Sequence, residues 1–265
     1  MLEVIPHSKP WIVKKDKIAL GKVLESGMIA QGNMTEKFEL KVSNYLNLKA
    51  SIACSSGTSA LVLALRSLEI GNESEVILPS YVCRNVCESV IAVGAKPIIC
   101  DIGDNWVMDF KNIEPLISKK TSAIILVHTF GLPVDINSFQ NLNIPIIEDA
   151  CQAFGLTSKS RKAGTLGDVS IFSFHATKCL TTGEGGMLNS NNTNIISRAR
   201  NLKVGKEDLD SIIPMPMSDL QAALGISQFD RYNKFLKRRK SIKEIFVNEL
   251  QNHIPIRKII VEADY

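Results

Sequence analysis

The chain contains 265 residues, with 31 Lys+Arg against 27 Asp+Glu, a formal net charge of +4 and 22% charged residues. This composition excludes a disordered or acidic solvating protein, and the length suits one large domain or two small ones. The densest basic cluster, 234–243, is explained equally well by the solvated face of a helix, so nucleic-acid binding is not favoured.

Residues 15–46 are predicted to form two helices separated by the glycine-marked break ESGMIAQGN. From residue 50, short aliphatic runs of strand length alternate with helical patterns. We expect strands at 51–54, 75–79, 97–101, 122–128, 144–149, 168–174 and 185–190, and helices at 58–68, 84–93, 112–118 and 136–142. This alternation predicts an α/β fold, a three-layer sandwich with a mostly parallel central sheet, whose ligands bind at the carboxyl ends of strands. Aromatic residues make up only 6%, which favours an aliphatic core.

Residues 219–250 have the pattern of one long amphipathic helix, in which Gly225 is the candidate position for a kink, and 254–265 resemble the first strand of a further unit. We therefore expect an N-terminal arm and large domain over 1–217. Residues 218–265 would form a connecting helix and the start of an incomplete C-terminal small domain.

No apolar run reaches the roughly 20 residues of a membrane span, and MLEVIPHSKP lacks a signal-peptide pattern, so we expect a soluble cytoplasmic protein. The six cysteines are scattered, without C-x-x-C pairs or matching His spacing, which favours neither a metal site nor a disulfide framework. Cys83 and Cys87, four apart in an expected helix, are interpreted as small buried apolar residues.

The most specific stretch is SFHATKCLTTGEGG, residues 173–186. Lys178 follows a buried-looking strand and precedes a glycine-dense turn that lets backbone pass close to a ligand. Partial desolvation at such a position favours the neutral amine that Schiff-base formation requires. Lys178 is therefore a candidate covalent lysine, although an isolated lysine is ordinarily a surface residue. The nearby His175 could contact substrate or serve in packing or at a dimer interface.

Two further segments end or follow strands. Glu148 and Asp149 close an aliphatic strand, where side chains alternate faces, so at most one of them points into a given site. Asp149 could cap the next turn, or a protonated pyridine nitrogen could be the partner that a buried carboxylate needs. The run SSGTSALVLALRSL, 55–68, places free backbone N–H groups at a helix start, a geometry that binds phosphate, although simple capping explains it too.

A phosphate cradle, a buried carboxylate and a strand-end lysine in one α/β sheet are together what pyridoxal 5′-phosphate requires. P-loop and Rossmann glycine patterns are absent, so hydrolysis of nucleotides and dinucleotide binding are disfavoured.

At these residues the chain resembles the DegT/DnrJ/EryC1/StrS family of sugar aminotransferases, within fold type I of the pyridoxal-phosphate enzymes. ESGMIAQGNMTEKFE, CSSGTSALVLAL, VHTFGLPVDI, IIEDACQAFG, GDVSIFSFHATKCLTTGEGG and MSDLQAALGISQ stand in the family's order. The resemblance implies that Lys178 and Asp149 are catalytic, with Lys178 holding the cofactor and moving a proton, and Asp149 pairing with the pyridinium nitrogen. It places Gln152 near the ring hydroxyl and the phosphate on Gly57, Thr58 and Ser173, next to Ser56. Cys83 occupies the position where members often place an aromatic ring over the cofactor, so that stacking contact is lost unless Tyr81 supplies it.

The resemblance further implies transfer of an amino group from glutamate or glutamine to a keto group of a sugar, typically nucleotide-linked, as in the biosynthesis of cell-surface polysaccharides or secondary metabolites. It also implies a homodimer with active sites at the subunit interface. The alternative is a shortened, catalytically silent protein that binds the cofactor or a partner, because relatives continue past this point into a small domain. An unrelated α/β domain with a structural Lys178 is disfavoured by the agreement of motifs.

Overall fold

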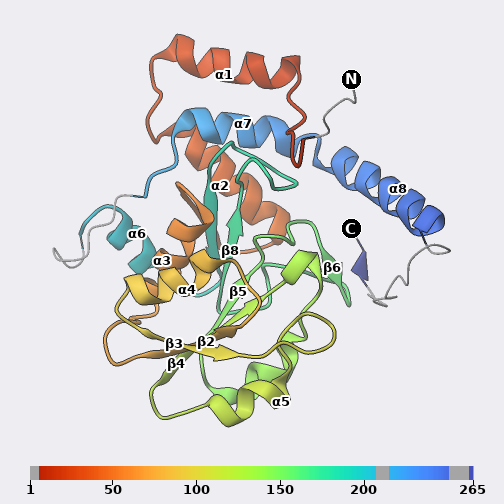
Figure 1. The fold of residues 1–265 in the computed structure, drawn as a ribbon. Helices are drawn as coiled ribbons and strands as arrows, with labels where there is room; N and C mark the ends of the chain where they lie inside the picture. The colour runs from red at the N-terminus through yellow and green to blue at the C-terminus, as the bar shows by residue number, and fades with distance from the viewer. Residues whose placement is uncertain (1–5, 207–214, 251–262, 265) are drawn as a thin grey trace.

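Seven strands form one central sheet in the computed structural model, which describes residues 6–206, 215–250 and 263–264. The strand order is β1-β9-β8-β5-β4-β2-β3, and Figure 1 shows the helices on either side of it. Neighbouring strands from β8 to β3 are parallel, whereas β9 runs antiparallel to both β1 and β8. The mostly parallel sheet expected from the sequence is confirmed. The sheet strands are β1 Ala50–Cys54, β2 Glu75–Pro79, β3 Lys96–Cys100, β4 Thr121–Val127, β5 Ile146–Asp149, β8 Val169–Ser173 and β9 Gly186–Ser190.

Alternation of side chains along the strands divides the interior into two faces. On β4, Ile125 packs with helices α3 (Gly57–Ser67), α4 (Arg84–Ala92) and α6 (Thr193–Lys203), whereas Ile124 and Leu126 pack on the opposite face. That opposite face is covered near β2 and β4 by α5 (Phe110–Ile113) and the 3-10 segments η1 (Glu114–Leu116) and η3 (Ile136–Leu142). The three layers follow directly from this alternation.

The part of the core beneath β8 and β9 is aromatic, in contrast to the aliphatic core expected from the composition. Phe154 lies at its centre, with ring centroids 4.9 Å from Phe172 and 5.2 Å from Tyr232. The few aromatic residues of the chain are therefore concentrated, with Phe38 and Phe174 in the same cluster. Against this cluster pack α2 (Asn33–Leu46) and α7 (Asp219–Phe229).

The predicted pair of N-terminal helices is confirmed as α1 (Lys14–Ser26) and α2, which we call the N-terminal arm. Both pack against α7. Buried Asp219, in the first turn of α7, accepts the N–H groups of Gly32, Met34 and Thr35 at 2.8–3.0 Å and so caps α2. Asp16 of α1 is buried, and its carboxylate accepts hydrogen bonds from both Nη atoms of Arg231 at 2.9 Å.

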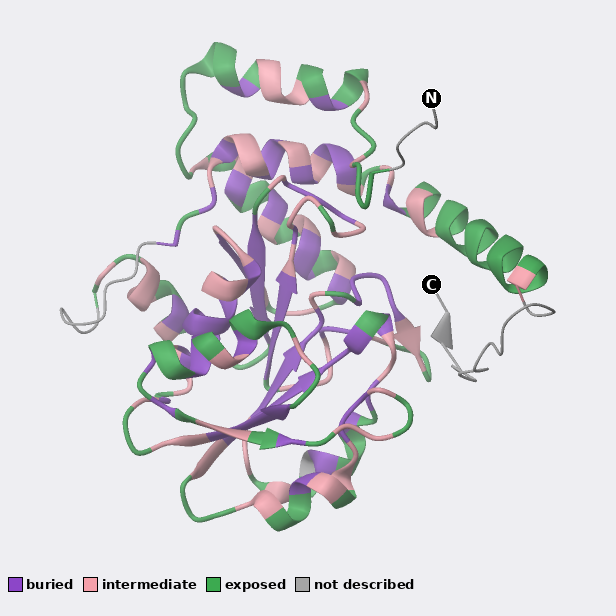
Figure 2. Cartoon of the chain, in the orientation of Figure 1, coloured by how far each residue is buried: buried purple, intermediate pink, exposed green. Residues whose placement is uncertain are grey.

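The prediction of one helix over 219–250 was wrong, because α7 ends at Phe229 and α8 (Tyr232–Leu250) begins after Asp230 and Arg231. The break coincides with the pairing of Arg231 with Asp16. Gly225 lies inside α7, where an added Cβ would stand 2.9 Å from the Phe38 ring, so its role is close packing and not a kink. Beyond its first two turns α8 is largely exposed, as Figure 2 shows.

Other local predictions need correction. Residues 112–118 and 136–142 contain a single α turn and 3-10 segments instead of regular helices. A hairpin of two-residue strands, β6 (Thr157–Ser158) and β7 (Arg161–Lys162), was not expected. Most of the strand predicted at 254–265 lies outside the described residues, but β10 (Ala263–Asp264) pairs with β6. No helix within the described residues is long and apolar enough to cross a membrane.

Candidate active site

A cavity of about 940 Å³ lies at the carboxyl ends of the parallel strands. All eight residues that the sequence assigned to catalysis or cofactor binding line it: Ser56, Gly57, Thr58, Cys83, Asp149, Gln152, Ser173 and Lys178. These residues come from four stretches of the chain, 56–58, 83, 149–152 and 173–178, and the fold brings them to one place. Their roles remain predictions, but their convergence is a property of the structure.

Lys178 lies in the turn that follows β8 and is half-buried. Its backbone N–H donates to the carbonyl of His175 at 2.9 Å, which closes the turn beneath the side chain. The His175 ring lies 2.8 Å from Thr177 Oγ1 and 3.4 Å from Glu184 Oε1. His175, Thr177 and Glu184 also line the cavity, so the wall around Lys178 is polar and titratable.

Asp149 ends β5 and is buried, with its side chain at the cavity. Burial raises the pKa of this carboxyl, against the opposing effects of the Cys151 N–H at 3.0 Å and of the Lys178 charge. Asp149 therefore both caps the following turn and presents a carboxyl to the cavity, so the two interpretations of the sequence coexist. A cation placed in the cavity would stabilise its charged form.

Glu148 points to the other side of β5, as strand alternation requires, and does not line the cavity. It is fully buried and accepts hydrogen bonds from the backbone N–H groups of Gly164, Leu166 and Gly167 and from His128 Nε2 at 2.8 Å. Burial disfavours its charge, but the His128 contact and the backbone donors outweigh this and lower the pKa of Glu148. His128, for which the sequence suggested no role, thus serves this buried pair.

The start of α3 forms an anion cradle. The Ser56 side chain caps the helix by accepting the Ser59 N–H at 3.0 Å, and the N–H groups of Gly57 and Thr58 lie in the first turn, where a helix offers no internal acceptor. An added Cβ on Gly57 would stand 2.8 Å from Ser173 Cβ, so only glycine lets the helix start approach β8 this closely. The Thr58 hydroxyl accepts a hydrogen bond from Asn85 Nδ2 at 3.0 Å.

Cys83 is exposed and stands at the N-cap position of α4, which corrects its interpretation as a buried helical residue. Cys87, one helical turn further along, is partly buried. The cap position places the Cys83 thiol on the cavity wall, where its Sγ lies 3.6 Å from Asn85 Oδ1.

Two cavity residues, Thr129 and Phe130, were not predicted from the sequence. Thr129 follows β4, and within the described part of the chain its buried Oγ1 is one of three buried side-chain polar atoms without a hydrogen-bond partner. Phe130 lines the cavity and is exposed, and so does and is Tyr81, the candidate that the sequence offered for stacking on the cofactor. The signal that could have found Thr129 and Phe130 is position, because each lies within three residues of the carboxyl end of a parallel strand.

The site fits pyridoxal 5′-phosphate on four independent counts. It offers a half-buried amine on Lys178, a buried carboxyl on Asp149, unpaired amides in an anion cradle and the unsatisfied Thr129 hydroxyl. The Gln152 amide lines the same cavity, with its Oε1 accepting the Phe130 N–H at 2.8 Å. Nothing in this donor set conflicts with the group.

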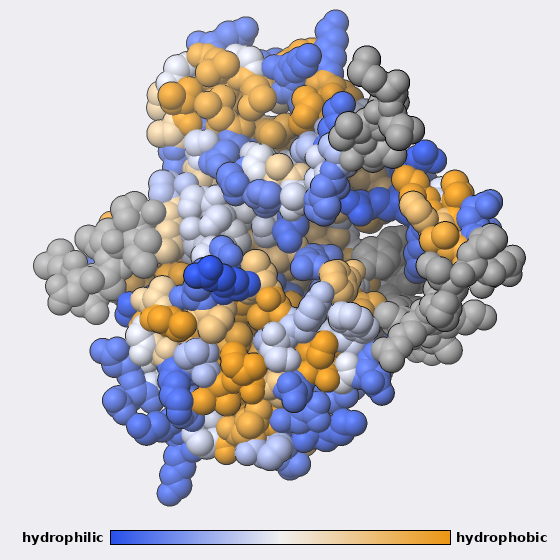
Figure 3. All heavy atoms as spheres, in the orientation of Figure 1, coloured by the Kyte–Doolittle hydropathy of each residue, from blue (hydrophilic) through white to orange (hydrophobic). Residues whose placement is uncertain are grey.

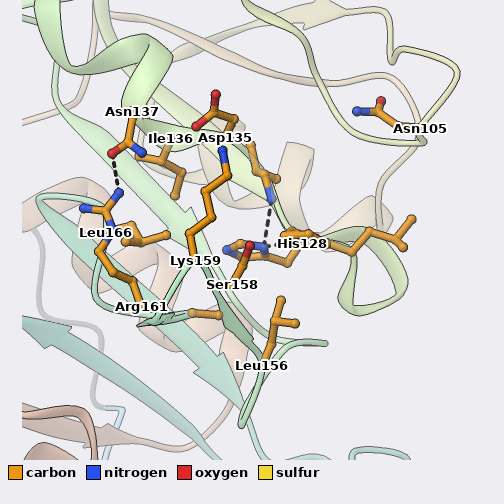
Figure 4. A pocket seen from close by; sticks show the side chains of 14 residues that line it. Asn105, His128, Asp135, Ile136, Asn137, Leu156, Ser158, Lys159, Arg161 and Leu166 are labelled. Atoms are coloured by element: carbon orange, nitrogen blue, oxygen red, sulfur yellow. Dashed lines mark hydrogen bonds between the residues drawn. The ribbon is translucent and has the colours of Figure 1, made fainter. Parts of the chain in front are cut away.

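A second cavity, of about 310 Å³, lies on the other side of His128 and contains none of the predicted site residues. Figure 4 shows Lys159 and Arg161, from the β6–β7 hairpin, extending toward Asp135 and Asn137, with Arg161 hydrogen-bonded to Asn137. His128, which contacts buried Glu148, lines this second cavity and not the candidate active site.

Comparison with known proteins agrees with this geometry. The sequence profile of the DegT/DnrJ/EryC1/StrS aminotransferase family matches residues 10–263. GDP-perosamine synthase of Vibrio cholerae is 33% identical over 260 residues, covering 93% of this chain and 71% of the relative. A putative sugar aminotransferase from Streptococcus pneumoniae, solved in its PLP form, superposes with a TM-score of 0.86 at 31% identity and covers 93% of this chain and 71% of that structure. The chain belongs to the DegT/DnrJ/EryC1/StrS aminotransferase family, whose members are pyridoxal-phosphate-dependent transaminases.

Proposed function

We propose that this protein transfers an amino group from glutamate or glutamine to a keto carbon of a nucleotide-linked sugar destined for a cell-surface polysaccharide or secondary metabolite. The observation that carries the proposal is the convergence of Lys178, Asp149 and the α3 cradle in one cavity. Relatives support the substrate class: a UDP-N-acetyl-3-dehydro-alpha-D-glucosamine 3-aminotransferase from Acidithiobacillus ferrooxidans is 35% identical over 211 residues, covering 77% of this chain and 56% of the relative. A spore coat polysaccharide biosynthesis protein of Bacillus subtilis is 33% identical over 260 residues.

Each residue has a distinct part in this proposal. When bound, pyridoxal phosphate supplies the electron sink and carries the amino group between the two substrates. Lys178 would hold it through Nζ and, once released, would accept and return the proton at the substrate carbon. The Asp149 carboxylate would keep the ring nitrogen protonated, while Gln152 would face the ring hydroxyl.

The remaining residues would position the cofactor. Ser56, Gly57, Thr58 and Ser173 would surround the phosphate, because the helix start and the β8 end supply both amides and hydroxyls there. Cys83 would lie on the wall beside the ring, in the place that relatives give to an aromatic side chain. A cysteine offers a small polarizable contact where stacking would otherwise occur.

We also propose that the protein acts as a homodimer. The stretch from residue 11 to residue 29 exposes several large apolar side chains, and Figure 3 shows apolar surface over α1. Exposed patches of this kind mark interaction surfaces. The side chains concerned are Trp11, Ile12, Ile18, Leu24, Met28 and Ile29, of which Met28 is 74% exposed.

The decisive test of the site is reduction with borohydride after addition of pyridoxal phosphate, followed by peptide mapping. We expect one pyridoxyl adduct, on Lys178, and none in Lys178→Ala. Lys162, on the surface hairpin, gives a matched control, since Lys162→Ala should retain the adduct. An adduct elsewhere, or none, would refute the assignment of Lys178.

Amine transfer from glutamate to a nucleotide-linked keto-sugar tests the reaction itself. The active protein should form the amino-sugar, and Lys178→Ala should lower the rate by about 10²-fold or more, the typical effect of a lost acid-base group. A protein that forms the Lys178 adduct without product would instead be the catalytically silent binding protein that the sequence left open.

A further inference from the structure

Three aromatic side chains meet beside the mouth of the cavity. Tyr81 follows β2, Trp106 follows β3 and Phe130 follows β4, and these are three neighbouring strands of the sheet. The ring centroids are 5.2 Å apart for Tyr81 and Trp106, and 6.0 Å apart for each of the other two pairs. We call these residues the aromatic platform.

Two of the three platform rings are exposed to solvent, where an apolar ring gains no stabilisation from burial. Phe130 is 61% and Tyr81 47% exposed, and both line the cavity that contains Lys178. None of the three residues belongs to the hydrophobic core clusters found in the described part of the chain. Stabilisation of the fold therefore does not account for their meeting at this point.

The backbone of the platform is also strained. Trp106 has φ 67° and Phe130 φ 54°, values in the left-handed region that bulky residues rarely adopt. Each conformation is held in place: Trp106 N–H donates to Gly103 O at 3.0 Å, and Phe130 N–H donates to Gln152 Oε1 at 2.8 Å. Strain of this kind persists at sites where the side chain is needed in one orientation. Because Gln152 itself lines the cavity, the platform is tied to the predicted cofactor site.

We propose that Tyr81, Trp106 and Phe130 stack on the base of the nucleotide-linked sugar. This inference rests on the proposed function, which places the keto carbon at Lys178. Asp149 and Ser173 end β5 and β8, whereas the platform follows β4, β2 and β3, so the two groups are separated by one to four strand spacings, roughly 5–20 Å. The hexose and the diphosphate separate the keto carbon from the base, so the base reaches the platform while the sugar remains at Lys178.

Stacking also suits the ligand chemistry. Every base has an aromatic face, and stacking on aromatic side chains is tolerant of base identity. The platform would therefore accept purine and pyrimidine nucleotides alike, and discrimination between sugars would fall to the polar wall of His175, Thr177 and Glu184.

Trp106 provides a direct readout that does not depend on turnover. The chain has two tryptophans, and the other, Trp11, packs against Phe235 of α8. In a Trp11→Phe protein loaded with cofactor, Trp106 is the sole tryptophan, and titration with GDP or UDP should quench its fluorescence saturably. Phe130→Leu should raise the Kd of both nucleotides about ten-fold, and Phe130→Tyr should restore it. Phe246→Leu, which removes a ring that is 60% exposed on α8, is the matched control and should leave both Kd values unchanged.

The borohydride and amine-transfer assays are run on the same protein preparations. The proposed function and the proposed role of the platform can therefore be refuted separately. If the Lys178 adduct and product form but Phe130→Leu and Phe246→Leu bind nucleotides equally, the platform does not bind the base and the proposed function stands. Absence of any saturable quenching overturns the platform as well. Absence of adduct and product in the unsubstituted protein overturns the proposed function.

Discussion

Glu148 and Asp149 are adjacent carboxyl groups whose pKa values shift in opposite directions. Burial raises that of Asp149, which faces the cavity, whereas His128 and the amides of the 164–167 loop outweigh burial and lower that of Glu148. Strand alternation is the cause, because it sends consecutive side chains into different surroundings. The Asp149 carboxyl can therefore bind a ligand in the cavity, whereas the Glu148 carboxyl stabilises the fold.

Replacing Glu148 should destabilise the protein without touching the candidate active site. Glu148→Gln retains the shape but loses the charge that four donors share, and we expect a loss of about 2–4 kcal/mol in the free energy of unfolding at pH 7. Urea denaturation measures it. Glu114→Gln, an exposed control, should leave stability within about 0.5 kcal/mol.

The effect of Glu148 should depend on pH in a defined direction. Its pKa in the folded protein lies below the ordinary 4.5, so the charged carboxylate stabilises the fold above pH 4.5, and this contribution is lost as the pH falls through the folded value. The stability difference between the parent and Glu148→Gln should therefore shrink in acid. A difference that grows in acid would contradict the lowered pKa.

Replacing Asp149 should affect the reaction more than the fold. Asp149→Asn keeps an oxygen to accept the Cys151 N–H but cannot hold a charge opposite the ring nitrogen. We expect amine transfer to fall by about 10²-fold or more, as is usual when a preorganised electrostatic partner is removed, with the Lys178 adduct still formed. Rate measurements beside borohydride mapping separate the two effects, and an undiminished rate would remove Asp149 from the proposed chemistry.

Functional residues that stand in a recognisable motif could be predicted from the sequence. Residues whose importance depends only on the folded structure could not. Lys178 and Asp149 could be found because each stands in a distinctive segment. The unsatisfied hydroxyl of Thr129 and the left-handed Phe130 could not, since neither property is encoded by residue type. Cys83 was misplaced because it stands at the N-cap position just before α4 and is exposed there, a property that its apolar character does not reveal.

Among the elements, α7 organises the N-terminal arm through buried carboxylates. Burial disfavours the charge on Asp219, but the backbone N–H groups of α2 and the Thr35 hydroxyl outweigh this and lower its pKa. The same balance applies to Asp16. Burial disfavours its charge, but hydrogen bonds from Arg231, the Val13 backbone and Ser227 outweigh burial and lower its pKa. Asp219 thus holds α2 to the start of α7, and Asp16 holds α1 to Ser227 near the end of α7 and to Arg231 just beyond it.

Removal of the remote cap should loosen the arm. Asp219→Ala deprives three N–H groups at the start of α2 of their acceptor, and we expect a loss of about 1–3 kcal/mol in the free energy of unfolding. Urea denaturation and hydrogen exchange at residues 33–36 measure the loss globally and locally. Asp101→Ala, at an exposed position, is the control, and equal exchange in both variants would argue against capping from α7.

The position of the strands could be predicted because buried strands are aliphatic runs of suitable length, and seven such runs correspond to the seven strands of the sheet. The break between α7 and α8 could not, because helix propensity is continuous across 229–232 and the break coincides with the contact of Arg231 with Asp16, 215 positions earlier. The β6–β7 hairpin escaped because strands of two residues leave no periodic pattern.

Across the whole molecule, apolar surface remains exposed on α1 and on α8. Ile245 and Phe246 of α8 are 56% and 60% exposed, and Leu24 and Met28 near the end of α1 are 60% and 74% exposed. The chain spans 71% of the length of the Vibrio relative. The apolar surfaces on α1 and α8 are two separate candidates for contacts with other protein segments. We assign the α1 surface to the dimer.

A charge placed on the α1 surface should weaken the dimer. Leu24→Glu introduces a carboxylate that burial would desolvate, and we expect the dimer Kd to rise at least about ten-fold by sedimentation equilibrium. Ile99→Glu, at a 50% exposed position on β3, serves as the control and should leave the Kd unchanged. A larger effect of Ile99→Glu would move the interface to the opposite edge of the molecule.

The capping of α2 by Asp219, across 187 positions of sequence, has a consequence for biosynthesis. The N-terminal arm leaves the ribosome first, yet its buried polar contacts are completed only when residues 219–231 emerge. Until then the surfaces of α1 and α2 that pack on α7 lack this partner in their own chain, and α7 of a neighbouring nascent copy presents the same groups. The arm is therefore the segment through which two chains made side by side would exchange helices.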